Sequence, residues 1–158
     1  KGRTVAYVGD GNNVAASLAQ ASVMLGMHVR IATPEGFELN AGLAESVTRI
    51  ARFGATLTQG HDPVEAVEGA DAVYTDAWAS MGQEDDAERR TGIFRPFQVN
   101  AAMMAAAGKD ALFMHCLPAH RGLEVTDEVI DSPASIVFDQ SENRLHTQKA
   151  LLAMMSAR

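Results

Sequence analysis

The chain lacks several features that would indicate particular classes of protein. It has one cysteine in 158 residues, so it cannot form an internal disulfide, and we expect a protein of the reducing cytoplasm. The formal net charge of −7 disfavours nucleic acid and anionic membrane surfaces as partners. No apolar run approaches the ~20 residues of a membrane-spanning helix, and the first residues lead directly into a strand-like segment. We therefore expect neither a membrane span nor a signal peptide.

The length and composition suit one globular domain. Apolar residues make up 47% of the sequence, and a chain of 158 residues is long enough to bury a sizeable core. A chain that opens on its first strand is also typical of a piece cut from a longer polypeptide. We expect another part of the protein to precede Lys1.

Strand-like and helix-like segments alternate along the chain. The predicted strands are residues 4–9, 28–32, 56–59, 72–75, 111–114 and 135–138. The predicted helices are residues 13–25, 41–52, a segment starting at Pro63, 96–107, 127–130 and 143–155, with a long polar loop at 76–94. Short connections between such elements predict an α/β fold, a doubly wound parallel sheet of Rossmann type in three layers, with strand order 3-2-1-4-5-6. The methionine pairs 103–104 and 154–155 are expected in the core.

Unusual polar stretches follow four of the predicted strands. They are residues 9–13, 76–82, 115–122 and 139–144. Because the carboxyl ends of parallel strands share one edge of the sheet, we expect these stretches to meet there and form a ligand site.

The stretch at 9–13 suggests a dinucleotide fingerprint but departs from it. Val14 occupies the third glycine position, and no acidic residue ends the second strand. A tight turn that leaves Asn13 free to point into the crevice is the favoured interpretation.

The remaining candidates each have a structural and a functional interpretation. Asp76 is either a cap or solvated acid, or a carboxylate that pairs with a substrate ammonium. Cys116 is either a small buried side chain or a reactive group, and its loop lacks the paired spacing of a zinc site. Arg144 is either a surface arginine or part of an anion site at the start of the last helix.

Four ordered motifs resemble those of ornithine carbamoyltransferases. They are His115-Cys116-Leu117-Pro118 with the Ala119-His120-Arg121-Gly122 that follows, Asp76-Ala77-Trp78-Ala79-Ser80-Met81-Gly82, Gly9-Asp10-Gly11-Asn12-Asn13, and Glu142-Asn143-Arg144-Leu145-His146. The resemblance covers essentially the whole chain and implies the C-terminal, ornithine-binding domain of such an enzyme. Cys116 favours this branch, because the related aspartate carbamoyltransferases carry proline in that position.

The resemblance also implies that half of the enzyme is absent from this chain. Family members begin with a carbamoyl-phosphate domain that holds a Ser-x-Arg-Thr-Arg motif and a His-Pro-x-Gln motif, and neither occurs here. We expect the N-terminal domain of the same polypeptide as a partner, a homotrimer or a higher assembly of trimers, and little turnover from this chain alone.

The family mechanism assigns roles to particular residues. The residues that the resemblance places on L-ornithine are Asn13, Asp76, Ser80 and Met81. Those it places near carbamoyl phosphate are His115, Cys116, Leu117 and Arg144, with Cys116 and Asp76 sharing the proton of the reacting amine. No metal or cofactor is implied, and the loop after Asp76 is expected to close over ornithine.

Two other functions stay open from the sequence. One is a carbamoyltransferase for another amine, such as putrescine or an N-acylated ornithine, and Asp76 and Asn13 disfavour it because they suit a free α-amino acid. The other is a non-catalytic amino-acid-binding domain of the same fold, which the combination of Asp76, Cys116 and Arg144 disfavours.

Overall fold

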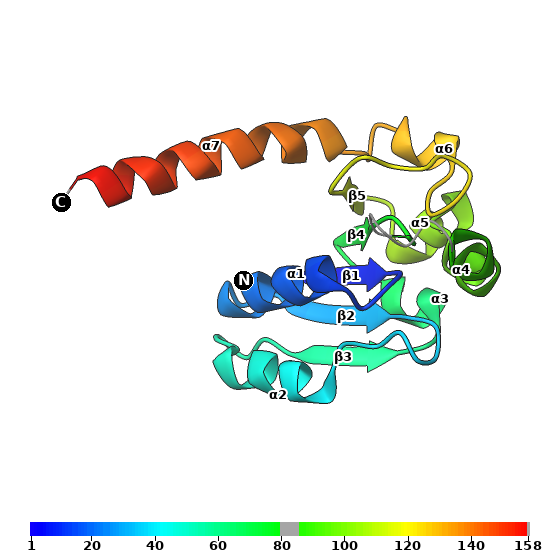
Figure 1. Cartoon of the computed structure of the whole chain (residues 1–158), viewed down its shortest axis with the longest axis horizontal. Helices are drawn as coiled ribbons and strands as arrows, with labels where there is room; N and C mark the ends of the chain where they lie inside the picture. The colour runs from blue at the N-terminus through cyan, green and yellow to red at the C-terminus, as the bar shows by residue number, and fades with distance from the viewer. Residues whose placement is uncertain (80–85, 158) are drawn as a thin grey trace.

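The computed structural model describes residues 1–79 and 86–157, and Figure 1 shows a twisted sheet with helices on both faces. The strands are β1 (Thr4–Val8), β2 (His28–Ala32), β3 (Leu57–Gly60), β4 (Ala72–Thr75) and β5 (Leu112–His115). The helices are α1 (Asn13–Met24), α2 (Ala41–Ile50), α3 (Pro63–Val67), α4 (Ala87–Phe94), the 3-10 helix η2 (Arg95–Phe97), α5 (Ala101–Ala107), α6 (Asp127–Ile130) and α7 (Val137–Ser156).

The sheet has the predicted doubly wound order for the first five predicted strands. Its strands run β3-β2-β1-β4-β5, and every neighbouring pair is parallel. Val5 of β1 pairs with Val29 on one side and with Ala72 on the other. The strand order reverses between β1 and β4, so the carboxyl ends of these two strands border the crevice where ligands bind in such folds. The α/β fold class predicted from the sequence is confirmed.

Alternation along β1 divides the core between the two faces of the sheet. Val5 and Tyr7 belong to a cluster with the apolar side of α1 and with Val47 of α2. Ala6 and Val8 belong to a second cluster with Val67 of α3 and with side chains of α5. Burial on both faces explains why the strands read as continuous apolar runs.

The predicted sixth strand at 135–138 was wrong. In the described part of the chain, Ser135 makes one isolated bridge to Phe113, and α7 begins at Val137 and not at Asn143. The N–H of His115, at the end of β5, donates to the Gln140 side chain at 3.2 Å, so a helical residue takes the place of a neighbouring strand. A short apolar run does not by itself distinguish strand from helix.

The predicted loop and the helix after it also have different bounds. The second part of the 76–94 stretch is α4, and the predicted helix at 96–107 is broken into η2 and α5. The break lets Val99 bridge to Val125 and lets Asn100 cap α5 by accepting from the Met103 N–H.

The last helix departs from the core. Figure 1 shows α7 starting beside β5 and projecting beyond the sheet towards the C terminus. Met154 and Met155, which were predicted in the core, are 75% and 65% exposed. No helix in the described ranges is long and apolar enough to span a membrane.

We predict that Gly11 is required for the turn after β1. A Cβ at this position would lie 2.4 Å from the Phe37 carbonyl oxygen, which is backbone and cannot move aside freely. Gly11→Ala in the full-length protein should lower the free energy of unfolding by about 1–3 kcal/mol, as overpacking does.

The matched control is Gly92→Ala in α4, where a Cβ meets nothing within 4 Å. Alanine favours a helix over glycine, so this variant should unfold at the same or a higher temperature. Equal melting temperatures for Gly11→Ala and the wild type in calorimetry would contradict the close approach.

Candidate active site

Three polar side chains meet at the carboxyl edge of the sheet, each after a different strand. Asp76 follows β4 and accepts two side-chain hydrogen bonds. The Asn12 Nδ2 donates to its Oδ2 at 2.9 Å, and the Cys116 Sγ donates to its Oδ1 at 2.9 Å. The turns after β1, β4 and β5 are therefore joined through one carboxylate.

Asp76 is fixed by the strand that precedes it. The buried Thr75 hydroxyl donates to the Val8 carbonyl at 2.6 Å, which ties the end of β4 to the end of β1. The Ala77 N–H donates to Asp76 Oδ1 at 2.8 Å. The carboxylate thus has backbone as well as side-chain donors, while part of it stays accessible to solvent.

Asn12 links this carboxylate to α1. Its Oδ1 caps the helix by accepting from the N–H groups of Val14 and Ala15, at 2.9 and 3.2 Å. Its Nδ2 is then directed at Asp76, so capping orients the amide. The Tyr7 hydroxyl lies 3.5 Å from Asn12 Oδ1, on the side of Asn12 that faces the buried end of β1.

The surroundings keep Cys116 protonated. Burial raises the pKa of the Cys116 thiol to about 12, and the hydrogen bond to Asp76 and the charge of Asp76 act in the same direction. At neutral pH the group is a thiol that donates a proton, and not a thiolate. Burial also raises the pKa of Tyr74 to about 12, with the neighbouring Cys116 adding to the effect.

Gln140 connects the start of α7 to this edge. Its Nε2 donates to the Tyr74 hydroxyl at 2.9 Å, and its Oε1 accepts from the His115 N–H at 3.2 Å. Arg144 lies four residues further along α7, on the same side of the helix as Gln140, and is exposed.

The His115 ring is fully buried and turned into the domain. Its Nδ1 accepts from the Leu117 N–H at 2.8 Å, so that nitrogen carries no proton. Its Nε2 lies 3.4 Å from Glu124 Oε1, and Glu124 is also fully buried. The same Oε1 accepts a hydrogen bond from the His120 N–H, which holds the two ends of the loop together.

The buried Glu124 stays anionic in this setting. Burial, the largest effect on its pKa, would raise it. Hydrogen bonding from the His115 ring and from the backbone N–H groups of His120 and Glu124 outweighs burial, and the pKa is lowered. The carboxylate therefore lies close to His115 Nε2, at 3.4 Å. Leu117, held by this ring, adopts a positive φ of 54°.

The predicted site residues fall into three groups. Asp76 and Cys116 are in contact, with His115 and Leu117 in the same loop as Cys116. Asn13 and Arg144 are exposed, at the first turn of α1 and on α7. Ser80 and Met81 lie outside the described residues.

The residues that sequence reasoning missed are Asn12, Tyr74, Gln140 and Glu124. Asn12 had a visible signal, because an asparagine before a helical pattern is a typical N-cap. Gln140 lies within the polar stretch 139–144 but was not singled out. Glu124 had no signal, since a buried glutamate is identified only by its partners.

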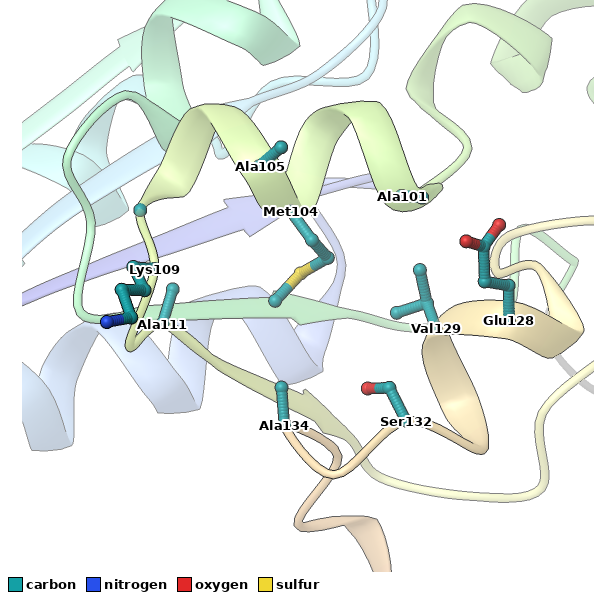
Figure 2. A pocket seen from close by; sticks show the side chains of 10 residues that line it. Ala101, Met104, Ala105, Lys109, Ala111, Glu128, Val129, Ser132 and Ala134 are labelled. Carbon is teal, nitrogen blue, oxygen red and sulfur yellow. The ribbon is translucent and has the colours of Figure 1, made fainter.

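A cavity of about 300 Å³ lies elsewhere, between α5 and α6 (Figure 2). Figure 2 shows Met104 reaching from α5 towards the side occupied by Val129 and Ser132. Its lining is mostly small and apolar, and it includes none of Asn12, Asp76 and Cys116. The cavity offers no set of converging polar groups comparable to that at the sheet edge.

Comparisons with known proteins show which family the chain resembles. Residues 1–155 match the sequence model of the aspartate/ornithine carbamoyltransferase Asp/Orn binding domain. The chain is 58% identical to the anabolic ornithine carbamoyltransferase of Pyrococcus furiosus over 156 residues, covering 98% of this chain and 50% of that protein. It is 54% identical to the ornithine carbamoyltransferase of Symbiobacterium thermophilum, covering 99% of this chain and 51% of that protein.

Solved structures give the same result. The ornithine carbamoyltransferase of P. furiosus superposes with a TM-score of 0.92 at 58% identity, covering 97% of this chain and 49% of that one. The anabolic enzyme of Campylobacter jejuni superposes with a TM-score of 0.90 at 36% identity, covering 97% and 51%. The chain spans about half the length of the curated relatives it matches.

We predict that Cys116 ionises only at high pH, because burial and Asp76 raise the pKa of its thiol. In the full-length protein, alkylation of Cys116 by iodoacetamide should stay slow through the pH range in which an ordinary thiol, with a pKa of ~8.5, becomes reactive. Asp76→Asn should move the onset to lower pH, because it removes the neighbouring negative charge. Peptide mass spectrometry at each pH measures this directly.

Asp110→Asn is the matched control, since this exposed aspartate lies before β5 and should leave the alkylation profile unchanged. A wild-type profile that rises at ordinary thiol pH would contradict the assignment of Cys116 as a hydrogen-bond donor to Asp76.

Proposed function

The chain belongs to the aspartate/ornithine carbamoyltransferase family through its Asp/Orn binding domain, and on that premise we propose that it forms the ornithine-binding half of an ornithine carbamoyltransferase. The whole protein would transfer the carbamoyl group of carbamoyl phosphate to the δ-amino group of L-ornithine, giving L-citrulline and phosphate. The observation that carries the proposal is the Asp76 carboxylate, held by Asn12 and Cys116 at the sheet edge.

The charge of this site favours ornithine over aspartate. Asp76 presents a carboxylate that attracts the α-ammonium of an amino acid and repels a substrate with a second carboxylate. In the proposed complex, Asp76 holds the α-ammonium, and Asn13 with Ser80 and Met81 holds the rest of the amino-acid end. Asn12 acts by orienting Asp76.

The reacting amine must lose a proton before it attacks. The δ-amino group of ornithine has an ordinary pKa near ~10, so it is protonated at neutral pH. Cys116 lies within hydrogen-bond distance of Asp76 and would lie beside this amine. A bound ammonium favours the thiolate, so binding of ornithine draws the pKa of Cys116 down from about 12. Cys116 and Asp76 then share the proton that the δ-amino group gives up.

Carbamoyl phosphate would bind across the loop after β5. The Leu117 carbonyl accepts from the carbamoyl amide, and Arg144 stabilises the negative charge of the phosphate and of the tetrahedral intermediate. The His115 ring is buried behind this loop, so we assign it the role of holding the Leu117 N–H and not of contacting the substrate through the ring.

The other half of the enzyme would cover α7. Large apolar side chains of this helix are exposed, namely Phe138, Leu145, Leu151, Leu152, Met154 and Met155. A helix end with this much exposed apolar surface is typical of an interface. We propose that the carbamoyl-phosphate domain of the same polypeptide packs there, that the protein forms a homotrimer or an assembly of trimers, and that it works in the cytoplasm.

The test is a citrulline assay on the full-length protein. Carbamoyl phosphate is supplied with ornithine, putrescine, N-acetylornithine or aspartate as the acceptor. We expect turnover on ornithine and little on the others, because Asp76 requires a free α-ammonium. Asp76→Asn should lower kcat/KM for ornithine by about 100-fold or more, as loss of a charged hydrogen bond in a site does. Asp110→Asn should retain wild-type kcat/KM.

Two outcomes would change the proposal. Turnover on putrescine or N-acetylornithine would keep the reaction but reject the role of Asp76 in binding the α-ammonium. No turnover on any acceptor, in a folded protein with its carbamoyl-phosphate domain, would indicate a non-catalytic amino-acid-binding protein.

A further inference from the structure

A buried arginine lies next to the candidate site, and the reaction does not use it directly. Arg90 of α4 is 6% exposed. Its guanidinium donates to the Trp78 carbonyl and to the Asp10 carboxylate. It also lies 4.9 Å from the ring centre of Phe37 and 5.0 Å from that of Phe94. Burial of a charged side chain with this many partners indicates a specific role for its charge.

The partners of Arg90 lead back to the turn that carries Asn12. Asp10 is two residues before Asn12, and the Asn12 N–H donates to the Asp10 carbonyl at 2.7 Å. The Gly11 N–H donates to the Phe37 carbonyl at 2.8 Å. Arg90 thus contacts Asp10 and Phe37, which border the turn on two sides, and the same turn presents the Asn12 amide to Asp76.

Asp10 brings a second carboxylate to the site. Its side chain is 16% exposed, and it follows β1 at the same edge as Asp76. The pKa of Asp10 is raised above its ordinary value. Burial raises it most and the Asp76 charge adds to this, while the Arg90 charge and hydrogen bond lower it. Two neighbouring carboxylates, neither paired with a cation, would compete for the same proton or ammonium. Arg90 supplies that cation to Asp10.

We propose that Arg90 is a positioning residue for the amine substrate: it pairs with Asp10 and fixes the turn before Asn12, so that the substrate ammonium binds at Asp76 and not at Asp10. The inference rests on the proposed function and adds a residue that sets where the ammonium binds. Arg90 does not contact the reacting atoms. Its effect reaches the substrate through the charge of Asp10 and the position of Asn12.

The test is a double-variant cycle on the full-length enzyme, with KM for ornithine and for carbamoyl phosphate as readouts. Arg90→Met leaves Asp10 as an unpaired anion that competes for the ammonium. Asp10→Asn leaves Arg90 as an unpaired cation that repels it. We expect each single variant to raise KM for ornithine by about tenfold or more, with KM for carbamoyl phosphate changed less than about threefold.

The double variant Arg90→Met/Asp10→Asn separates charge pairing from a merely structural role. With both charges removed, KM for ornithine should return to within about threefold of the wild type. The proposal is overturned if the increases in KM for ornithine combine in the double variant instead of cancelling. It is also overturned if the single variants keep the wild-type KM. Arg89→Met is the matched control, because the neighbouring Arg89 side chain is 67% exposed and should leave both KM values unchanged.

Two further measurements keep the result interpretable. If Arg90→Met does not fold, Arg90→Lys keeps the charge without the planar guanidinium. A KM for ornithine near the wild-type value in Arg90→Lys then supports the charge role, and a KM raised tenfold overturns it. If the wild-type enzyme forms no citrulline, the proposed function fails. The same cycle is then run on the Kd for ornithine by calorimetry, where the same rescue in the double variant supports the role of Arg90 and its absence overturns it.

Discussion

The hydrogen bonds to the Asp76 carboxylate are the interaction on which the rest of the site depends. Asn12 and Cys116 both donate to it, and neither is near Asp76 in the sequence. The parallel sheet brings them together, because the turns after β1, β4 and β5 open at the same edge. The carboxylate then adds to the burial that keeps Cys116 protonated, accepts from the Asn12 amide that helix capping orients, and gives the site its negative charge.

Buried polar groups behind the edge keep this arrangement in place. The buried His115 ring accepts from the Leu117 N–H in the loop that carries Cys116, and Glu124 lies on the other side of the ring. Gln140 joins that loop to the first turn of α7, and Arg90 joins α4 to the turn before Asn12. Each of these groups contacts a different segment, so a change in one segment is transmitted to the side chains at the sheet edge. Such polar networks determine geometry more than they add stability.

Periodicity and strand-end polarity predicted the sheet and the edge at which Asp76 and Cys116 meet, because both depend on local patterns. Asp76 and Cys116 were found in this way, and they are in direct contact. The start of α7 was missed because Ser135 to Phe138 is too short to distinguish strand from helix, and the bond from His115 to Gln140 joins residues far apart in the sequence. Arg90, Glu124 and Gln140 could not be assigned from the sequence, since their roles come from partners brought close by the fold and not from residue type.

In the proposed complex, Asp76 binds the α-ammonium of the substrate. The most direct measurement is calorimetry of L-ornithine and of 5-aminopentanoate, which lacks the α-amino group, on the full-length wild type and on Asp76→Asn. We expect the wild type to bind ornithine about 10- to 100-fold more tightly than the analogue, and the variant to bind both with similar Kd. A variant that keeps the full preference for ornithine would contradict this role of Asp76, because the α-ammonium would then bind elsewhere.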